Sequence, residues 1–139
     1  MPPRSTIPGT PQEWLARAKS NLLMAKGAKV EGVFWEDLCF NAQQAAEKSL
    51  KAVLQHKQIP FRYVHDLEEL ITTLERQGSI VPQSVKEAEI LSHYAFATRY
   101  PGDLEEVTEE EYHRAFSLAE QVVVWAEEVL SPATSSADS

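Results

Sequence analysis

The sequence predicts an all-α protein that folds as an up-and-down bundle of about five helices. Three observations lead to this expectation. Apolar residues recur three and four positions apart in successive segments, which is the spacing of one helix face. Capping residues or prolines precede these segments, and no alternating apolar and polar run is long enough for a strand in a sheet. A chain of 139 residues is expected to form one domain with a single core.

The first helix is expected to begin at Thr10, because Thr10 to Glu13 reads Thr-Pro-Gln-Glu, a capping box with proline at the first helical position. Its apolar residues follow at helical spacing: Leu15, Ala18, Leu22 and Ala25. Residues 1–10 contain prolines and no apolar stretch, so we expect a flexible leader and no signal peptide. The helical domain is assigned to residues 11–130.

The second helix is expected from about Trp35 to Lys57, with apolar residues that cover an arc of roughly 200°. This arc is wider than one core face needs. The helix therefore either lies in the middle of the bundle or shares its surplus face with a second subunit. The rest of its surface is polar and comprises Asn41, Gln44, Glu47, Lys48, Lys51 and Gln55.

The third helix is expected to begin at Asp66, a capping residue followed by an acidic first turn, and to end at Gly78. Pro82 opens the fourth helix. This helix must stop near Thr98, because the residue before Pro101 is forced out of the α region.

A third capping sequence, Thr108 to Glu111, opens the fifth helix, which is expected to reach about Leu130. Residues 131–139 are rich in serine and alanine and contain no large apolar residue. We expect them to form a disordered tail.

The formal net charge of −8 argues against nonspecific nucleic-acid binding. The charge is unevenly placed, because residues 103–128 contain nine acids and one arginine, whereas residues 14–30 and 48–65 contain basic residues and no acid. These basic segments either bind a phosphate-containing ligand or form two solvated helix faces. No apolar run approaches the roughly 20 residues needed to span a bilayer, so no membrane contact is expected.

The single cysteine, Cys39, is expected to be a small buried residue and not a nucleophile. One unpaired thiol is compatible with a reducing cytoplasm, which is the expected location. No two histidines lie at the i, i+4 spacing of a helical zinc site. The glycines form no phosphate-binding loop, and no Gly-x-Ser-x-Gly sequence indicates a nucleophile. We therefore expect neither a metal nor a cofactor.

Polar residues of the second helix form the first candidate site. Gln44, Lys48 and Lys51 share one polar arc, while Gln43 lies at the edge of the apolar arc and would need hydrogen-bond partners once buried. The alternative is an ordinary helix surface with neighbours at i, i+4, namely Gln44 with Lys48 and Glu47 with Lys51.

Two further places are candidates. The first is His65 with Asp66, for which the alternative is that Asp66 caps the third helix and His65 packs against the preceding loop. The second is Arg99, on the core-facing side of the fourth helix if that helix reaches it. A core-facing arginine must find an anion, a carbonyl or an acid, with Glu47 or Asp103 as alternative partners.

Three segments together resemble the HEPN family, the higher eukaryotes and prokaryotes nucleotide-binding domain. They are FNAQQAAEKSLKAVL at residues 40–54, His65-Asp66-Leu67 with the leucine-rich helix that follows, and Tyr94 followed by Arg99-Tyr100-Pro101. The similarity extends from Trp14 to about Leu130.

This resemblance implies a bacterial or archaeal helical bundle that forms homodimers and is often encoded beside a small nucleotidyltransferase, as in toxin–antitoxin-like pairs. The positions that match the family pattern are Gln43, Gln44, Glu47, Lys48, His65, Tyr94, Arg99 and Tyr100. Together with the polar arc, they give the candidates for nucleotide or phosphate binding: Gln44, Lys48, Lys51, His65, Tyr94, Arg99 and Tyr100.

Many proteins of the family are metal-independent ribonucleases that carry an arginine and a histidine with four to six residues between them. In this sequence two residues separate Arg62 from His65, thirteen separate Arg99 from His113, and His93 precedes Arg99. No catalytic residue is assigned for this reason.

Three hypotheses follow. The first, preferred because the ribonuclease pair is absent, is a non-catalytic, nucleotide-binding, dimeric partner of a small nucleotidyltransferase. The second is a metal-independent ribonuclease toxin with a degenerate site around Arg99 and His93. The third is a structural dimer whose polar residues satisfy one another.

Overall fold

The computed structural model describes residues 9–26, 31–95 and 106–131, and every regular element in these ranges is helical. The elements, in chain order, are α1 (Pro11–Lys26), α2 (Trp35–His56), α3 (Leu67–Arg76), α4 (Gln83–Lys86), the 3-10 helix η2 (Glu87–Tyr94) and α5 (Glu109–Leu130). The predicted all-α bundle is therefore confirmed. The expected leader and tail fall mainly on residues 1–8 and 132–139, which lie outside the described residues.

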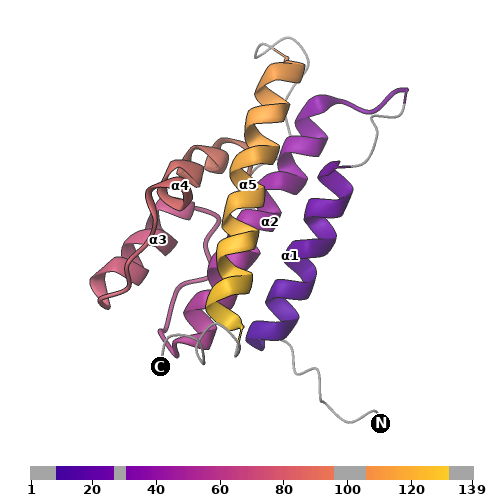
Figure 1. Ribbon diagram of the computed structural model, residues 1–139. Coiled ribbons are helices and arrows are strands. Elements are labelled where there is room, and N and C mark those ends of the chain that lie inside the picture. Colours follow the sequence, from indigo (N-terminus) through magenta and orange to yellow (C-terminus); the bar gives the residue numbers. More distant parts are fainter. Residues whose placement is uncertain (1–8, 27–30, 96–105, 132–139) are drawn as a thin grey trace, which may run out of the picture.

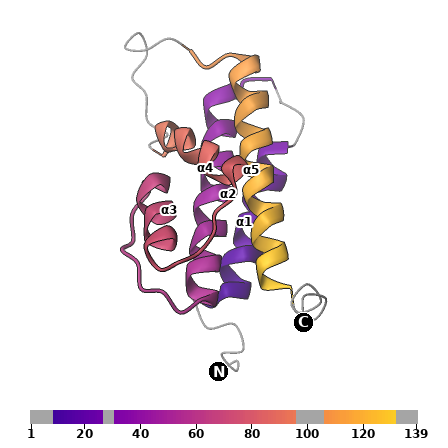
Figure 2. The same ribbon diagram turned by 60° about the vertical axis from the view of Figure 1, so that its left-hand side comes forward.

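Helix α2 occupies the centre of the bundle. Figures 1 and 2 show α1, α2 and α5 running side by side, with α3 and α4 on the other side of α2 from α1. Helix α2 contacts α1, α5, α3 and η2, so it is covered from several directions. This position explains its wide apolar arc, and it agrees with the first of the two alternatives that the sequence left open.

Helix starts follow the capping sequences. The side chain of Thr10 accepts a hydrogen bond of 3.1 Å from the backbone N–H of Glu13, and that of Asp66 accepts one of 3.0 Å from Glu68. At α5 the capping box is complete, because Thr108 and Glu111 each accept from the other's backbone N–H. These bonds satisfy N–H groups that have no partner within the helix.

The chain leaves α3 through Gly78, as predicted. Gly78 has a φ of +89°, a left-handed conformation that favours glycine. The backbone N–H of Ser79 donates to the carbonyl of Leu74 over 3.0 Å, which is the bond of a glycine-terminated helix end.

The fourth helix departs from the prediction of one α-helix from Pro82 to Thr98. Only Gln83–Lys86 is α-helical, and the chain then tightens into the 3-10 helix η2. The fully buried residues Val85, Ala88 and Leu91 lie three positions apart. Side chains at that spacing are aligned in a 3-10 helix, so this winding keeps them on the core side. The expected stop near Thr98 lies outside the described residues.

Helices α1 and α5 are joined by polar contacts across the bundle. The hydroxyl of Tyr112 donates a buried hydrogen bond of 2.6 Å to the carbonyl of Ala25, and Lys19 pairs with Glu127.

Cys39 is fully buried, as predicted. Within the described ranges, no helix is both long enough and apolar enough to cross a membrane.

Candidate functional site

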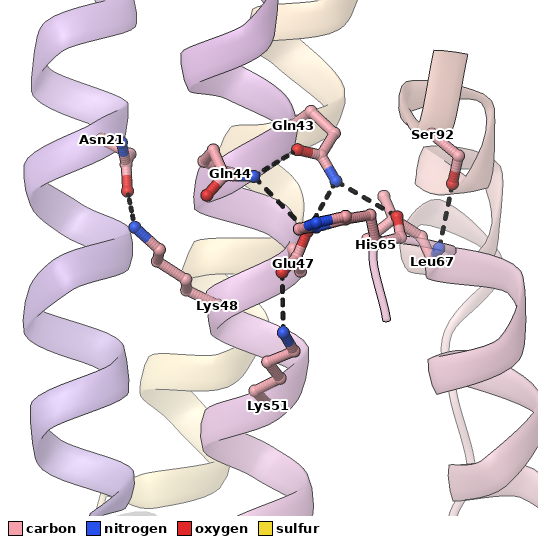
Figure 3. Close-up of polar contacts among 9 residues, drawn as sticks. All are labelled: Asn21, Gln43, Gln44, Glu47, Lys48, Lys51, His65, Leu67 and Ser92. Carbon is pink, nitrogen blue, oxygen red and sulfur yellow. Dashed lines mark hydrogen bonds and ion pairs between the residues drawn. The ribbon is translucent and has the colours of Figure 1, made fainter. Parts of the chain in front are cut away.

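Three side chains at successive four-residue intervals on α2 form a hydrogen-bonded line inside the bundle (Figure 3). Glu47 Oε1 accepts a hydrogen bond of 2.9 Å from Gln43 Nε2, and Glu47 Oε2 forms an ion pair of 2.7 Å with Lys51 Nζ. The exposed fractions of Gln43, Glu47 and Lys51 are 0%, 3% and 4%. Buried polar groups need partners, and these residues supply them to one another.

A histidine from the loop after α2 joins this line. His65 Nδ1 lies 3.0 Å from Glu47 Oε1, and the backbone oxygen of His65 accepts a hydrogen bond of 3.3 Å from Gln43 Nε2. The ionised Glu47 carboxylate can only accept hydrogen bonds, so His65 Nδ1 carries a hydrogen and donates the hydrogen bond. The loop is thereby fixed to the centre of α2.

The charge of Glu47 is maintained by its neighbours. Burial on its own would raise the pKa of the Glu47 carboxyl. Hydrogen bonds from Lys51, Gln43 and His65, together with the charge of Lys51, outweigh burial and bring this pKa below its ordinary value of 4.5. Glu47 is therefore an anion at neutral pH and anchors the network.

Lys51 is buried, which corrects its expected place on a polar surface arc of the second helix. Its Nζ lies 5.3 Å from the ring centroid of Trp14 and 5.5 Å from that of Tyr63. Helix α1, which carries Trp14, and the loop that carries Tyr63 cover this side of α2. The ammonium is held by these rings and by Glu47, so an outside anion would have to displace them.

Lys48 faces α1 and is only partly buried. Its Nζ donates a hydrogen bond of 2.8 Å to Asn21 Oδ1, a neutral acceptor. Burial lowers the pKa of Lys48 below its ordinary value of 10.5, the charge of Glu47 opposes this shift, and the charges of Arg17 and Lys51 reinforce it. Among the described residues, the ammonium of Lys48 has no ion-pair partner.

Gln44 bonds to the buried line on α2. Its Nε2 donates a hydrogen bond of 2.7 Å to Gln43 Oε1 and a longer one of 3.4 Å to Glu47 Oε1. Of the two i, i+4 pairs that the sequence offered as an alternative, the pair of Glu47 with Lys51 is confirmed. Gln44 bonds instead to Gln43 and Glu47, because both lie toward the buried line.

A cavity of about 950 Å³ lies beside this network, between the loop before α3, the first turn of α3 and η2. Its apolar lining consists of Val64, Ile90 and Ala95, and its acidic lining consists of Asp66, Glu68, Glu69 and Glu89. His65 and His93 also line it. The cavity therefore combines apolar surface with an excess of carboxylates.

Two polar contacts hold the walls of this cavity in place. Arg62 Nε and Nη2 bond to the two carboxylate oxygens of Glu69 at 2.9 and 3.1 Å. Ser92 Oγ, on η2, accepts a hydrogen bond of 2.9 Å from the backbone N–H of Leu67, the first residue of α3 (Figure 3). The start of α3 is thus tied to η2.

The remaining candidates lie apart from the line on α2 or outside the described ranges. The hydroxyl of Tyr94 donates a hydrogen bond of 2.9 Å to Glu111 Oε2, and this bond links η2 to α5. Arg99 and Tyr100, with Asp103 as the alternative partner of Arg99, lie outside the described residues. The structure brings Gln44, Lys48, Lys51 and His65 onto or against one stretch of α2.

Two of the residues that sequence reasoning missed in this region form hydrogen bonds that hold it together. Asn21 contributes the acceptor for Lys48, and its own side-chain amide donates a hydrogen bond of 3.0 Å to Asn41 Oδ1. Its signal was a polar side chain on a helix that packs closely against α2. No pattern in the sequence indicated the role of Ser92, because its partner Leu67 is 25 positions away.

In the part of the chain that the structure describes, no cluster of three or more His, Cys, Asp or Glu could hold a metal ion.

A family comparison decides what this bundle is. The model of the HEPN domain matches residues 11–129, which is most of the chain. The chain belongs to the HEPN family. The resemblance seen in the sequence is therefore confirmed, and the polar line on α2 and the cavity beside it lie within the matched residues.

Two solved structures are similar to this HEPN protein. TT1696 from Thermus thermophilus has a TM-score of 0.71 and 29% identity, covering 88% of this chain and 99% of that chain. ST0689, an archaeal HEPN homologue, has a TM-score of 0.66 and 26% identity, covering 85% of this chain and 95% of that chain. No curated protein matches the sequence.

Proposed function

We propose that this HEPN protein is a non-catalytic, nucleotide-binding module that forms a homodimer and partners a small nucleotidyltransferase in a cytoplasmic toxin–antitoxin-like pair. The observation that carries the nucleotide part is the state of Lys48. Its ammonium is partly buried, and its hydrogen bond within the described residues goes to a neutral amide of Asn21. An anion at this place would offset the cost of burying the charge.

The surroundings of Lys48 support a phosphate there. The charge of Arg17, on α1, adds to the effect of burial and lowers the pKa of Lys48, while the guanidinium of Arg17 is itself bonded to Glu13 over 2.6 Å. Gln44 lies one helical turn before Lys48 and is also partly buried. Charged donors give short, strong hydrogen bonds to phosphate oxygens, so Lys48 would contact the phosphate and Gln44 would lie at its edge.

The absence of the family's ribonuclease spacing supports a non-catalytic role. No arginine of this sequence precedes a histidine by the four to six intervening residues of that motif. The nearest approach is Arg62 and His65, and each is held by an acid. Arg62 bonds to Glu69, and His65 bonds to Glu47.

Titration calorimetry with ATP and GTP tests the nucleotide part. We expect binding by the wild type and at least about tenfold weaker binding by Lys48→Met, because one charged phosphate contact is lost. Lys86→Met is the matched control, since Lys86 is also partly buried but pairs with Glu75 over 2.8 Å. Absence of heat at millimolar nucleotide, or equal weakening by both variants, would contradict binding at Lys48.

Light scattering and co-purification test the dimer and the partner. The chain has a mass of 15.6 kDa, so a homodimer has twice this mass in solution. A nucleotidyltransferase encoded beside this gene should co-purify with the tagged HEPN protein. A monomeric mass at every protein concentration would contradict the proposed dimer. A co-expressed nucleotidyltransferase that stays unbound would contradict the proposed partnership.

Ribonuclease activity is the second candidate, and the placement of two histidines favours it. His65 and His93 line the same cavity, and two imidazoles could act as general base and general acid on RNA. The four carboxylates of the same lining oppose the approach of an RNA phosphate, so this function ranks below the first. The test is RNA cleavage in EDTA by the wild type, Arg99→Ala and His93→Ala. Cleavage that falls in both variants would support a ribonuclease, whereas equal cleavage by all three proteins would indicate a contaminant.

A further inference from the structure

The cavity beside His65 has a chemical character that the proposed nucleotide site at Lys48 does not share. Four carboxylates and one arginine line it, which gives its lining a formal charge of −3 with both histidines neutral. The single cation, Arg62, is already bonded through two nitrogens to Glu69. A phosphate would therefore be repelled from this cavity, and a cation would be attracted.

Two of these carboxylates are available for a ligand. Within the described residues, the side chains of Glu68 and Glu89 make no hydrogen bond and no ion pair, and both residues are exposed. Asp66 and Glu69 are occupied by the α3 cap and by Arg62. Glu68 comes from the first turn of α3 and Glu89 from η2, so the two unpaired acids belong to different walls of the cavity.

The surface between these walls is apolar. Ile90 is a large aliphatic residue that is 41% exposed, and it lines the cavity together with Val64 and Ala95. A small polycation would neutralise the acids but would leave this apolar surface in water. A peptide that carries basic side chains next to aliphatic or aromatic ones would satisfy both parts.

The walls are also held in position before any ligand arrives. The bond from Leu67 N to Ser92 Oγ fixes the start of α3 against η2, and His65 is fixed to Glu47 on α2. A site that is already formed loses less conformational entropy on binding than one that must be ordered. This favours a specific contact over loose attraction between opposite charges.

We propose that this cavity is the docking site for a basic, partly apolar peptide segment of a protein partner, in which an arginine or lysine bonds to Glu68 and Glu89 and a neighbouring apolar side chain covers Ile90. The proposal rests on the proposed role as a partner module and names the surface and the chemistry by which the partner is held.

The probe is a short fluorescent peptide of alternating arginine and leucine, measured by fluorescence polarisation with the full chain at about 0.15 M salt. The Glu68→Gln/Glu89→Gln variant tests the cavity. The matched control is Glu110→Gln/Glu120→Gln, which removes the same charge from exposed positions of α5. We expect about tenfold weaker binding by the cavity variant, no change in the control, and weaker binding by Ile90→Ser.

Three results of the peptide assay would overturn the docking proposal. They are absence of binding by the wild type, equal loss in the cavity variant and its control, and displacement of the peptide by spermine at the same concentration as by unlabelled peptide. The first two would leave no specific site, and the third would indicate a small polycation as the ligand. Co-purification of the nucleotidyltransferase is scored separately with the same proteins. If the nucleotidyltransferase binds the wild type and the cavity variant equally, docking at the cavity is contradicted and the partner role is supported. If it binds neither protein, the partner role is contradicted.

Discussion

The carboxylate of Glu47 and the ammonium of Lys51 form an ion pair of 2.7 Å between side chains that are only 4% and 6% exposed. Two charges removed from water stabilise a fold only if each has further partners. Glu47 has them in Gln43, Gln44 and His65 (Figure 3). Lys51 has them in the rings of Trp14 and Tyr63.

Removing the carboxylate should destabilise the bundle strongly. Glu47→Ala leaves the buried Lys51 cation without its counter-charge, and we expect the free energy of unfolding in urea to fall by about 3–5 kcal/mol. The control is the pair of Glu75 with Lys86, whose side chains are 40% and 39% exposed. Glu75→Ala should change the same quantity by less than about 1 kcal/mol. Equal effects of the two substitutions would show that Glu47 has no special role.

Replacing both charged residues should be milder than the single losses suggest. Lys51→Met removes the cation but keeps an unbranched chain beside the two rings, and in Glu47→Gln/Lys51→Met no uncompensated charge remains. We therefore expect the double variant to lose less stability than the sum of Glu47→Gln and Lys51→Met. Strict additivity in the urea midpoints would mean that the two side chains do not interact.

Acid should weaken the fold through Glu47. The pKa of Glu47 is lower in the folded protein than its ordinary value of 4.5, so the unfolded chain binds this proton more tightly. The stabilisation is therefore complete above about pH 4.5 and is lost as the pH falls through the folded pKa. Urea unfolding from pH 7 to pH 3 should show this loss in the wild type. Glu47→Gln should be less stable at pH 7 and should depend less on pH in the acid range. Parallel curves for the two proteins would assign the acid sensitivity to other carboxylates.

The hydroxyl of Tyr112 should contribute to the joint between α5 and the end of α1. Tyr112→Phe keeps the ring, which lies 5.0 Å from that of Trp35, but removes the buried bond to the carbonyl of Ala25. We expect a loss of about 1–3 kcal/mol in urea unfolding, because the carbonyl loses its partner. Tyr63→Phe is the control, since Tyr63 is 78% exposed. A loss as large in the control would show that the bond to Ala25 is not the cause.

Local features of this fold were predictable because neighbouring residues determine them. The caps at Thr10, Asp66 and Thr108 and the turn at Gly78 each depend on a few consecutive residues, and all four lie where the sequence placed them. The width of the apolar arc of α2 predicted that this helix is covered on more than one side, but it left open whether the bundle or a second subunit covers it.

Features that depend on tertiary contacts were not predictable in the same way. Lys51 was assigned to a polar surface, because periodicity cannot show that Trp14 and Tyr63 cover that side of α2. The cavity requires the start of α3 to meet η2, two segments that no local pattern connects. The pairing of Glu47 with Lys51 was among the alternatives, but its burial was not, because the same i, i+4 spacing occurs on exposed helices.

The contact that closes this part of the fold gives the final prediction. Ser92 Oγ accepts from the backbone N–H of Leu67, one of the first groups of α3, which have no partner within the helix. Ser92→Ala should lower the free energy of unfolding by about 1–3 kcal/mol. It should also speed hydrogen exchange at the Leu67 amide as measured by NMR. Ser92→Thr keeps the hydroxyl and should restore both quantities in part, and Ser84→Ala, at an exposed position of α4, should leave both unchanged. An unaltered exchange rate at Leu67 in Ser92→Ala would contradict the bond. If the rate rises while the affinity for the arginine–leucine peptide falls with it, the hydroxyl also serves to hold the two acidic walls of the cavity at their binding separation.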